Sequence, residues 1–86
     1  MPISYVLINS DLGTDESIII KIKEILENEK EIEYEIQGVY GVYDIILKLS
    51  SANIDTLRSS ITNKIRKITS VQSTLTMMVI SEQEKS

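Results

Sequence analysis

Residues 31–49 read EIEYEIQGVYGVYDIILKL and decide the fold, because they hold two alternating apolar runs around a glycine-containing bend. In the first run, Ile32, Tyr34 and Ile36 alternate strictly with glutamate and glutamine, which predicts a strand with one wet face. The second run covers residues 42–49 and also alternates. It places Tyr43, Ile45, Leu47 and Leu49 on one face and Val42, Asp44, Ile46 and Lys48 on the other. Two such runs joined by a bend predict a β-hairpin.

A strand and a helix are expected before this hairpin. Residues 3–10 carry apolar side chains on both faces, which is typical of a strand that is covered on both sides. Gly13 ends the strand in a left-handed conformation, and Thr14 offers an N-cap oxygen for the helix that follows. That helix is expected to end between residues 28 and 30. Its apolar residues recur at helical spacing: Ile18, Ile22, Ile25 and Leu26.

A second helix and a last strand are expected after the hairpin. Asn53 can cap a helix that runs to Ile68. The apolar residues of this helix form a single stripe: Ile54, Leu57, Ile61, Ile65 and Ile68. A strand then covers residues 71–80. We expect residues 1–81 to form a single domain and residues 82–86 a polar C-terminal tail.

The element order is therefore βαββαβ. With right-handed crossovers, this order predicts an α+β, ferredoxin-like fold. Its four-stranded antiparallel sheet has the order 4-1-3-2, and both helices lie on one face. The second strand is then an edge strand, and its row of glutamates protects that edge against pairing with another chain.

Composition narrows the functional classes. The chain has 86 residues, of which 42% are hydrophobic, and it contains neither cysteine nor histidine. Disulfides, the Ser-His-Asp triad and the usual zinc and iron ligand sets are thereby excluded. We expect no cofactor, no metal and no catalytic activity. No apolar run is long enough for a membrane span, so a cytoplasmic protein is the expectation.

The charge balance argues against direct nucleic-acid binding. The net charge is −4, whereas proteins that bind nucleic acid on their own normally carry a basic stripe. One basic cluster exists, made of Lys64, Arg66 and Lys67. It falls in the expected last turn of the second helix, where positive charge complements the helix dipole.

In this arrangement no predicted element covers the second face of the sheet. Helices cover one face, yet the first, third and last strands place large apolar groups on both. In the last strand Leu75, Met77 and Val79 point one way, and Thr74, Thr76, Met78 and Ile80 point the other. An uncovered apolar face of this size predicts a partner, and a second copy packed sheet to sheet would supply the missing core. We therefore expect at least an obligate dimer.

Two short motifs are candidates for ligand binding. In Gly41-Val42-Tyr43-Asp44 the glycine permits close approach of a ligand, and the aspartate can hold an ammonium group. Thr74 and Thr76 are two apart on one strand, so both hydroxyls lie on one face and can donate to a carboxylate. Together the motifs match a zwitterionic amino acid. The alternative is structural: a turn glycine, an aspartate that bonds its own loop, and threonines that favour a strand.

These motifs resemble the effector-binding (RAM) domain of the leucine-responsive regulatory protein/AsnC (Lrp/AsnC) family. The resemblance rests on Gly41–Lys48 (GVYDIILK), Ile65–Ile68 (IRKI) and Val71–Thr76 (VQSTLT), and it extends from Tyr5 to about Ile80. It implies sheet-to-sheet dimers that assemble into rings, as an octamer or a decamer, with amino acids bound between dimers. It also implies an effector site made of Gly41, Tyr43, Asp44, Thr74 and Thr76. In that site Asp44 would meet the ligand's ammonium or another cationic group, and the hydroxyls would meet its carboxylate.

Transcription factors of this family carry a helix-turn-helix ahead of the domain, whereas the first strand expected here begins at Ile3. The resemblance thus implies a stand-alone module without its own DNA reader. Such a module would sense an amino acid or a related small molecule, or co-assemble with a full-length Lrp/AsnC-type regulator. Two alternatives remain open: a small dimeric α+β-barrel enzyme, in which Asp44 is the lone candidate for acid or base, and a pure oligomerisation or adaptor module.

Overall fold

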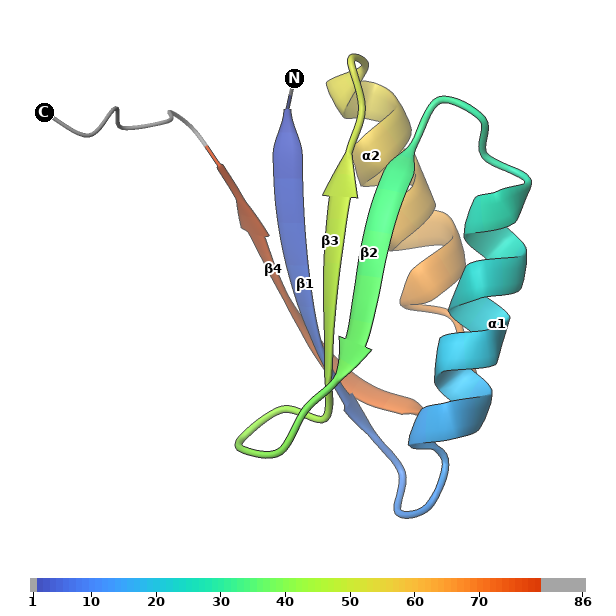
Figure 1. Ribbon diagram of the computed structural model, residues 1–86, viewed down its shortest axis with the longest axis vertical. Coiled ribbons are helices and arrows are strands. Elements are labelled where there is room, and N and C mark those ends of the chain that lie inside the picture. The colour runs from blue at the N-terminus through green and yellow to red at the C-terminus, as the bar shows by residue number, and fades with distance from the viewer. Residues whose placement is uncertain (1, 80–86) are drawn as a thin grey trace, which may run out of the picture.

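The computed structural model describes residues 2–79, apart from the side chain of Thr62 (Figure 1). Within this range the chain forms a βαββαβ unit with an added π-helical segment. Its elements are β1 (Ile3–Ser10), α1 (Asp15–Glu27), β2 (Glu33–Gly38), β3 (Ile45–Ser50), α2 (Ile54–Ser60), η1 (Ile61–Ile65) and β4 (Val71–Met78). Ile80 and the expected tail, residues 82–86, lie outside the described residues.

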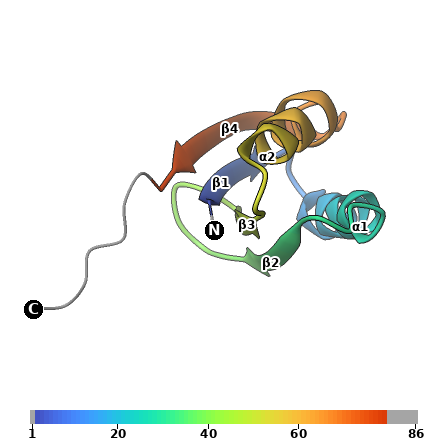
Figure 2. The same cartoon turned by 90° about the horizontal axis from the view of Figure 1, so that it is seen from above.

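The four strands form one antiparallel sheet with the order β2-β3-β1-β4, which confirms the expected ferredoxin-like topology. Both helices lie on the same side of this sheet, as the view along the strands shows (Figure 2). The register places Val6 between Leu47 on β3 and Thr76 on β4. Residues paired across antiparallel strands point to the same face, so this register assigns every strand residue to one face or the other.

The helix-covered face holds the core of the subunit. Val6 and Ile8 of β1 and Ile45, Leu47 and Leu49 of β3 are fully buried there, because alternate side chains of these strands point toward the helices. The core consists of Val6, Ile8, Ile18, Ile22, Leu26, Ile32, Ile45, Leu47, Leu49, Leu57, Ile61 and Ile65. None of the titratable side chains in residues 2–79 is buried, so this core offers no enclosed acid or base.

The opposite face, called here the open face, is also apolar over β1, β4 and part of β3. Its apolar residues are Ile3, Tyr5, Leu7, Ile46, Leu75, Met77 and Val79. Leu75 and Met77 each remain 44% exposed, as expected for side chains that no element within residues 2–79 covers. Toward β2 the open face becomes polar, with Glu35, Gln37 and Lys48.

The two edge strands differ in charge. Edge strand β2 carries Glu33 and Glu35, and the Glu35 carboxylate lies 3.9 Å from the Lys48 ammonium on the neighbouring strand. Charged side chains on an edge discourage pairing with a further strand. Edge strand β4 contains no charged residue, no proline and no glycine. The protection against edge pairing that was expected for the second strand therefore applies to the β2 edge, and the β4 edge lacks it.

The second helix differs from the expectation of a single α-helix up to Ile68. After α2 the chain continues as the π-helix η1, in which the Arg66 N–H donates to the Ile61 carbonyl at 3.1 Å. The apolar spacing explains the change. Leu57, Ile61 and Ile65 are four residues apart, and each such step overshoots one α-helical turn by about 40°. A π-helical segment has more residues per turn, so it offsets this drift and keeps all three side chains in the core.

Of the two N-caps predicted from the sequence, the one at Asn53 is confirmed and the one at Thr14 is wrong. The Asn53 side chain accepts hydrogen bonds from the N–H groups of Asp55 and Thr56, at 2.9 and 3.3 Å, as expected for an N-cap. Thr14 occupies the N-cap position of α1, but its side chain does not cap the helix. Its hydroxyl instead donates to the Asp11 carbonyl at 2.7 Å, across the turn that contains Gly13.

Candidate functional site

The hairpin loop is longer than the sequence predicts, because β3 begins at Ile45 and not at Val42. Val42, Tyr43 and Asp44 therefore belong to the bend. The Val39 N–H donates to the Asp44 carbonyl at 2.8 Å and closes the loop. Gly41 lies within it at a φ of 145°, a backbone conformation that side-chain-bearing residues rarely adopt. The expected alternation in residues 42–44 is real in the sequence, but the backbone bends away from the strand there.

Asp44 fastens this loop to the end of β1. Its Oδ2 accepts hydrogen bonds from the Ser10 N–H at 3.0 Å and from the Ser10 hydroxyl at 3.2 Å. Its own N–H donates to the Ile8 carbonyl at 3.0 Å. The structural alternative predicted that the aspartate bonds its own loop, whereas the side chain bonds Ser10 at the end of β1. Within residues 2–79, Oδ1 of the same carboxylate has no hydrogen-bond donor.

A hollow of about 440 Å³ opens beside Asp44 at this end of the sheet. Its lining includes three carboxylates, of Asp11, Asp15 and Asp44, and no lysine or arginine. Tyr40 and Leu12 stand fully exposed around it. The three acidic groups create a negative potential that favours a positively charged group such as an ammonium. In residues 2–79 no group of three potential ligand side chains is placed to hold a metal ion.

Thr74 and Thr76 lie on one face of β4, as expected, because they pair with Ile8 and Val6 on the helix-covered face. Thr74 is half-buried and Thr76 is exposed. Strand β1 separates them from Asp44: Ile8 is paired with Thr74 on one side and bonded to the Asp44 N–H on the other. The hollow that Asp44 lines includes neither threonine.

The other two predicted site residues lie in the bend itself. Tyr43 is half-buried, and Gly41 is exposed, with no atom within 4 Å of the position that a Cβ would take. A single chain thus presents the predicted residues as two separate groups, one in the hairpin loop and one on the β4 edge. Within one chain, β1 lies between the two groups.

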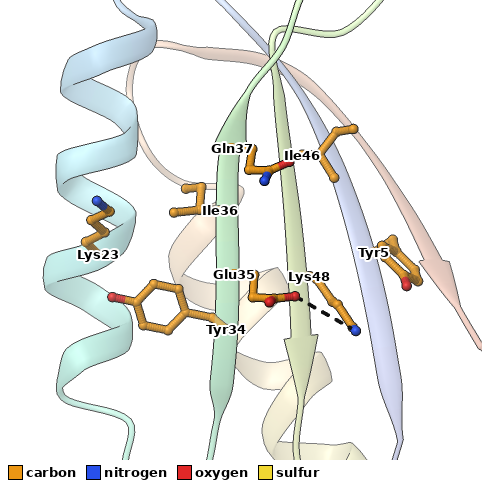
Figure 3. Close-up of a pocket in the computed structure, with 8 residues that line it drawn as sticks. All are labelled: Tyr5, Lys23, Tyr34, Glu35, Ile36, Gln37, Ile46 and Lys48. Carbon is orange, nitrogen blue, oxygen red and sulfur yellow. Dashed lines mark ion pairs between the residues drawn. The ribbon is translucent and has the colours of Figure 1, made fainter.

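A further hollow of about 620 Å³ surrounds the β2 edge (Figure 3). Lys23 and Tyr34 lie on its helix side, whereas Tyr5, Glu35 and Lys48 lie toward the open face (Figure 3). Because the backbone of β2 runs between the two groups, they do not face one another across a common cavity. None of the residues singled out from the sequence as effector contacts lines this hollow.

No helix within residues 2–79 is both long and apolar enough to cross a lipid bilayer.

Comparison with known proteins points to one family. The family model described as the Lrp/AsnC ligand binding domain matches residues 4–86. The crystal structure of FFRP-DM1 is 32% identical, with a TM-score of 0.73, and the match covers 93% of this chain and all of that one. Escherichia coli AsnC is 28% identical, with a TM-score of 0.73, and the match covers 99% of this chain and 54% of the AsnC chain.

A transcriptional regulator of Neisseria meningitidis, solved in complex with L-Met, shares the fold at 10% identity and a TM-score of 0.70. The match covers 99% of this chain and 53% of that regulator. Among curated proteins no sequence matches the chain.

Proposed function

Since the chain belongs to the Lrp/AsnC ligand binding domain family, we propose that it is a non-catalytic regulatory module that binds an amino acid or a related small molecule. Binding would act through the assembly of several copies and would modulate transcription regulators. The absence of buried titratable groups in residues 2–79 supports a binding role over the α+β-barrel enzyme, because such an enzyme needs an enclosed acid or base.

The proposed dimer forms sheet to sheet through the open face. Seven apolar side chains of that face lie side by side on three strands, and a monomeric protein rarely exposes so large an apolar patch. A chain of this size also gains little net stability from one core. Covering the open face with a second copy removes the exposed patch and adds a second layer of apolar burial.

The proposed effector site lies where such dimers meet in a ring, an octamer or a decamer. One copy contributes Gly41, Tyr43 and Asp44, and another contributes Thr74 and Thr76. The observation that carries this assignment is the state of the Asp44 carboxylate. Its Oδ2 is held by Ser10, so the group is fixed in place, while Oδ1 has no donor within residues 2–79 and can accept an ammonium. The threonine hydroxyls would donate to the ligand carboxylate.

Modulation of transcription would require a second protein. Both helices of residues 2–79 pack on the sheet, and the net charge of −4 disfavours direct DNA binding. The E. coli AsnC chain is nearly twice as long as the part of it that this chain matches. We propose co-assembly with a full-length regulator of this family, which would supply the DNA-binding part.

Isothermal titration against the twenty amino acids tests the effector site. We expect at least one of them to bind the wild-type chain, and Asp44→Asn to abolish that binding. Asparagine can still accept the Ser10 hydrogen bonds but lacks the charge that holds an ammonium. Asp55→Asn removes one charge in the first turn of α2, far from the hairpin loop, and serves as the matched control.

Sedimentation of the same variants separates binding from assembly. The proposal predicts that Asp44→Asn leaves the dimer intact. If no amino acid releases heat while the wild-type chain still forms dimers and rings, the proposal of an amino-acid effector is wrong and the adaptor alternative is favoured. If the folded chain is a monomer at micromolar concentration, the sheet-to-sheet dimer and the site between dimers are both wrong.

A further inference from the structure

A groove runs between the two helices on the side of the molecule opposite the open face. There α1 lies beside the C-terminal end of the continuous segment formed by α2 and η1 (Figure 1). The groove has a volume of about 360 Å³, which lies at the lower end of the range of small-molecule sites. Its apolar lining comes from Ile18 and Ile25 of α1 and from Ile68, which follows η1.

Three lysines surround this apolar floor. Lys21 comes from α1, and Lys64 and Lys67 come from the segment around the end of η1. The Lys64 ammonium pairs with the Glu29 carboxylate. Within residues 2–79, no carboxylate lies within ion-pair distance of the Lys21 or Lys67 ammonium, and no aspartate or glutamate lines the groove. The groove is therefore a small apolar surface under a positive potential, in a protein whose net charge is negative.

Helix-dipole complementation accounts for Lys64 but not for the whole arrangement. A helix C-terminus favours positive charge within its last turn, and Lys64 occupies that turn. Lys21 belongs to the middle of a different helix, where the macrodipole exerts little effect. Lys21 and Lys67 line the same groove as apolar side chains. This arrangement favours a ligand that has an anionic group and an apolar part.

We propose that this groove binds a branched aliphatic carboxylate that has no ammonium group. The aliphatic part would pack on Ile25 and Ile68, and the carboxylate would lie between the ammonium groups of Lys21 and Lys67. An amino acid is disfavoured, because its ammonium would enter the same positive potential. The hollow beside Asp44 has the opposite charge, so the two sites select ligands of opposite kinds. This proposal does not rest on the effector site at the hairpin.

Amide NMR titration with three probes tests the proposal. The probes are isovalerate, isoamylamine (the same branched chain with a cation) and acetate (the same anion without the chain). We expect isovalerate to shift the amides of residues 18–25 and 67–70, with a dissociation constant on the order of 1 mM for a ligand of this size. Isoamylamine and acetate should each bind at least about tenfold more weakly.

The paired variant Lys21→Gln/Lys67→Gln should weaken isovalerate binding by at least about fivefold. The matched control Lys23→Gln/Lys30→Gln removes the same charge from side chains outside the groove and should change binding by less than about twofold. The proposal is wrong if isovalerate shifts no amides around the groove, if isoamylamine binds as well as isovalerate, or if both variants bind alike. Each of these outcomes leaves the titration of amino acids at Asp44 unaffected, so failure here is distinct from failure of the effector site.

Discussion

On the helix-covered face of the sheet Val6, Ile8 and Leu47 are fully buried, whereas on the open face Leu75 and Met77 keep nearly half of their surface exposed. On β1 both faces carry apolar side chains, with Val6 and Ile8 on the covered face and Tyr5 and Leu7 on the open face. The difference lies in cover, since two helices pack on one face and no element of residues 2–79 packs on the other. An apolar pattern alone thus does not tell whether the same chain covers the surface that carries it.

This contrast predicts that one face determines subunit stability and the other determines association. Side chains on the covered face should determine the stability of the subunit at any protein concentration. Side chains on the open face should determine association, and should affect stability only through the concentration-dependent dimer. The variants below separate these two contributions, in order of decreasing expected effect.

Leu47→Ala should give the largest loss. Leu47 is fully buried between the sheet and the helices, and truncation of such a leucine leaves a cavity that costs about 2–5 kcal/mol. Urea unfolding should show this loss equally at low and high protein concentration. A loss that disappears on dilution would assign Leu47 to the association surface and undo the contrast between the faces.

Leu75→Lys should weaken the dimer without a comparable effect on the isolated subunit. The substitution removes an apolar contact and places a charge on the open face in both copies, at a cost of about 2 kcal/mol or roughly 30-fold in the dimer dissociation constant. Sedimentation velocity over a range of concentrations measures the shift. Gln37→Lys is the control on the polar part of the same face. Equal effects of the two substitutions would contradict an interface centred on the apolar part.

Asp44→Ala should reduce subunit stability by about 1–2 kcal/mol, because the Ser10 N–H and hydroxyl both lose their acceptor. Thermal unfolding measures the loss, and hydrogen exchange should place the increased opening in the hairpin loop and at the end of β1. Asp44→Asn retains an acceptor and should lose less. Uniform faster exchange across the sheet would show that the loop bond does not act locally.

Asn53→Ala and Thr14→Ala compare the starts of the two helices that cover the sheet. Asn53 accepts two N–H bonds, so its loss should cost about 1 kcal/mol. Thr14 does not cap α1, and its loss should cost less than about 0.5 kcal/mol, as for substitutions away from caps and the core. Chemical denaturation of both variants checks the order. A larger loss at Thr14 would contradict the observed hydrogen bonds.

Most of the fold could be predicted from the sequence, because local periodicity carries it. Alternation identified the strands, and the three- and four-residue spacing identified the helices. The order βαββαβ then left few allowed topologies. Local pattern failed at Val42–Asp44, where alternation continues into a bend held by contacts with β1, some 34 residues away in the sequence. It also missed η1, since an apolar repeat of four residues suits either kind of helix.

The candidate site was predictable in its residue types but not in its arrangement. The sequence indicated that Thr74 and Thr76 share a face, and pairing with β1 confirms it. It gave no sign that Ser10 holds Asp44, or that Asp11 and Asp15 surround it, because those contacts depend on how two loops meet. Likewise Lys67 belonged to a basic cluster in the sequence, but its neighbour Lys21 comes from the other helix.

The difference in charge between the two edge strands limits how many copies of the sheet could pair edge to edge. A strand from another molecule would meet two glutamates along β2 but a neutral backbone along β4. Two sheets joined through β4 would therefore present only acidic borders to the surroundings, and lateral extension would stop at the pair. One neutral edge would therefore permit a pair at most, whereas two neutral edges would permit an endless ribbon.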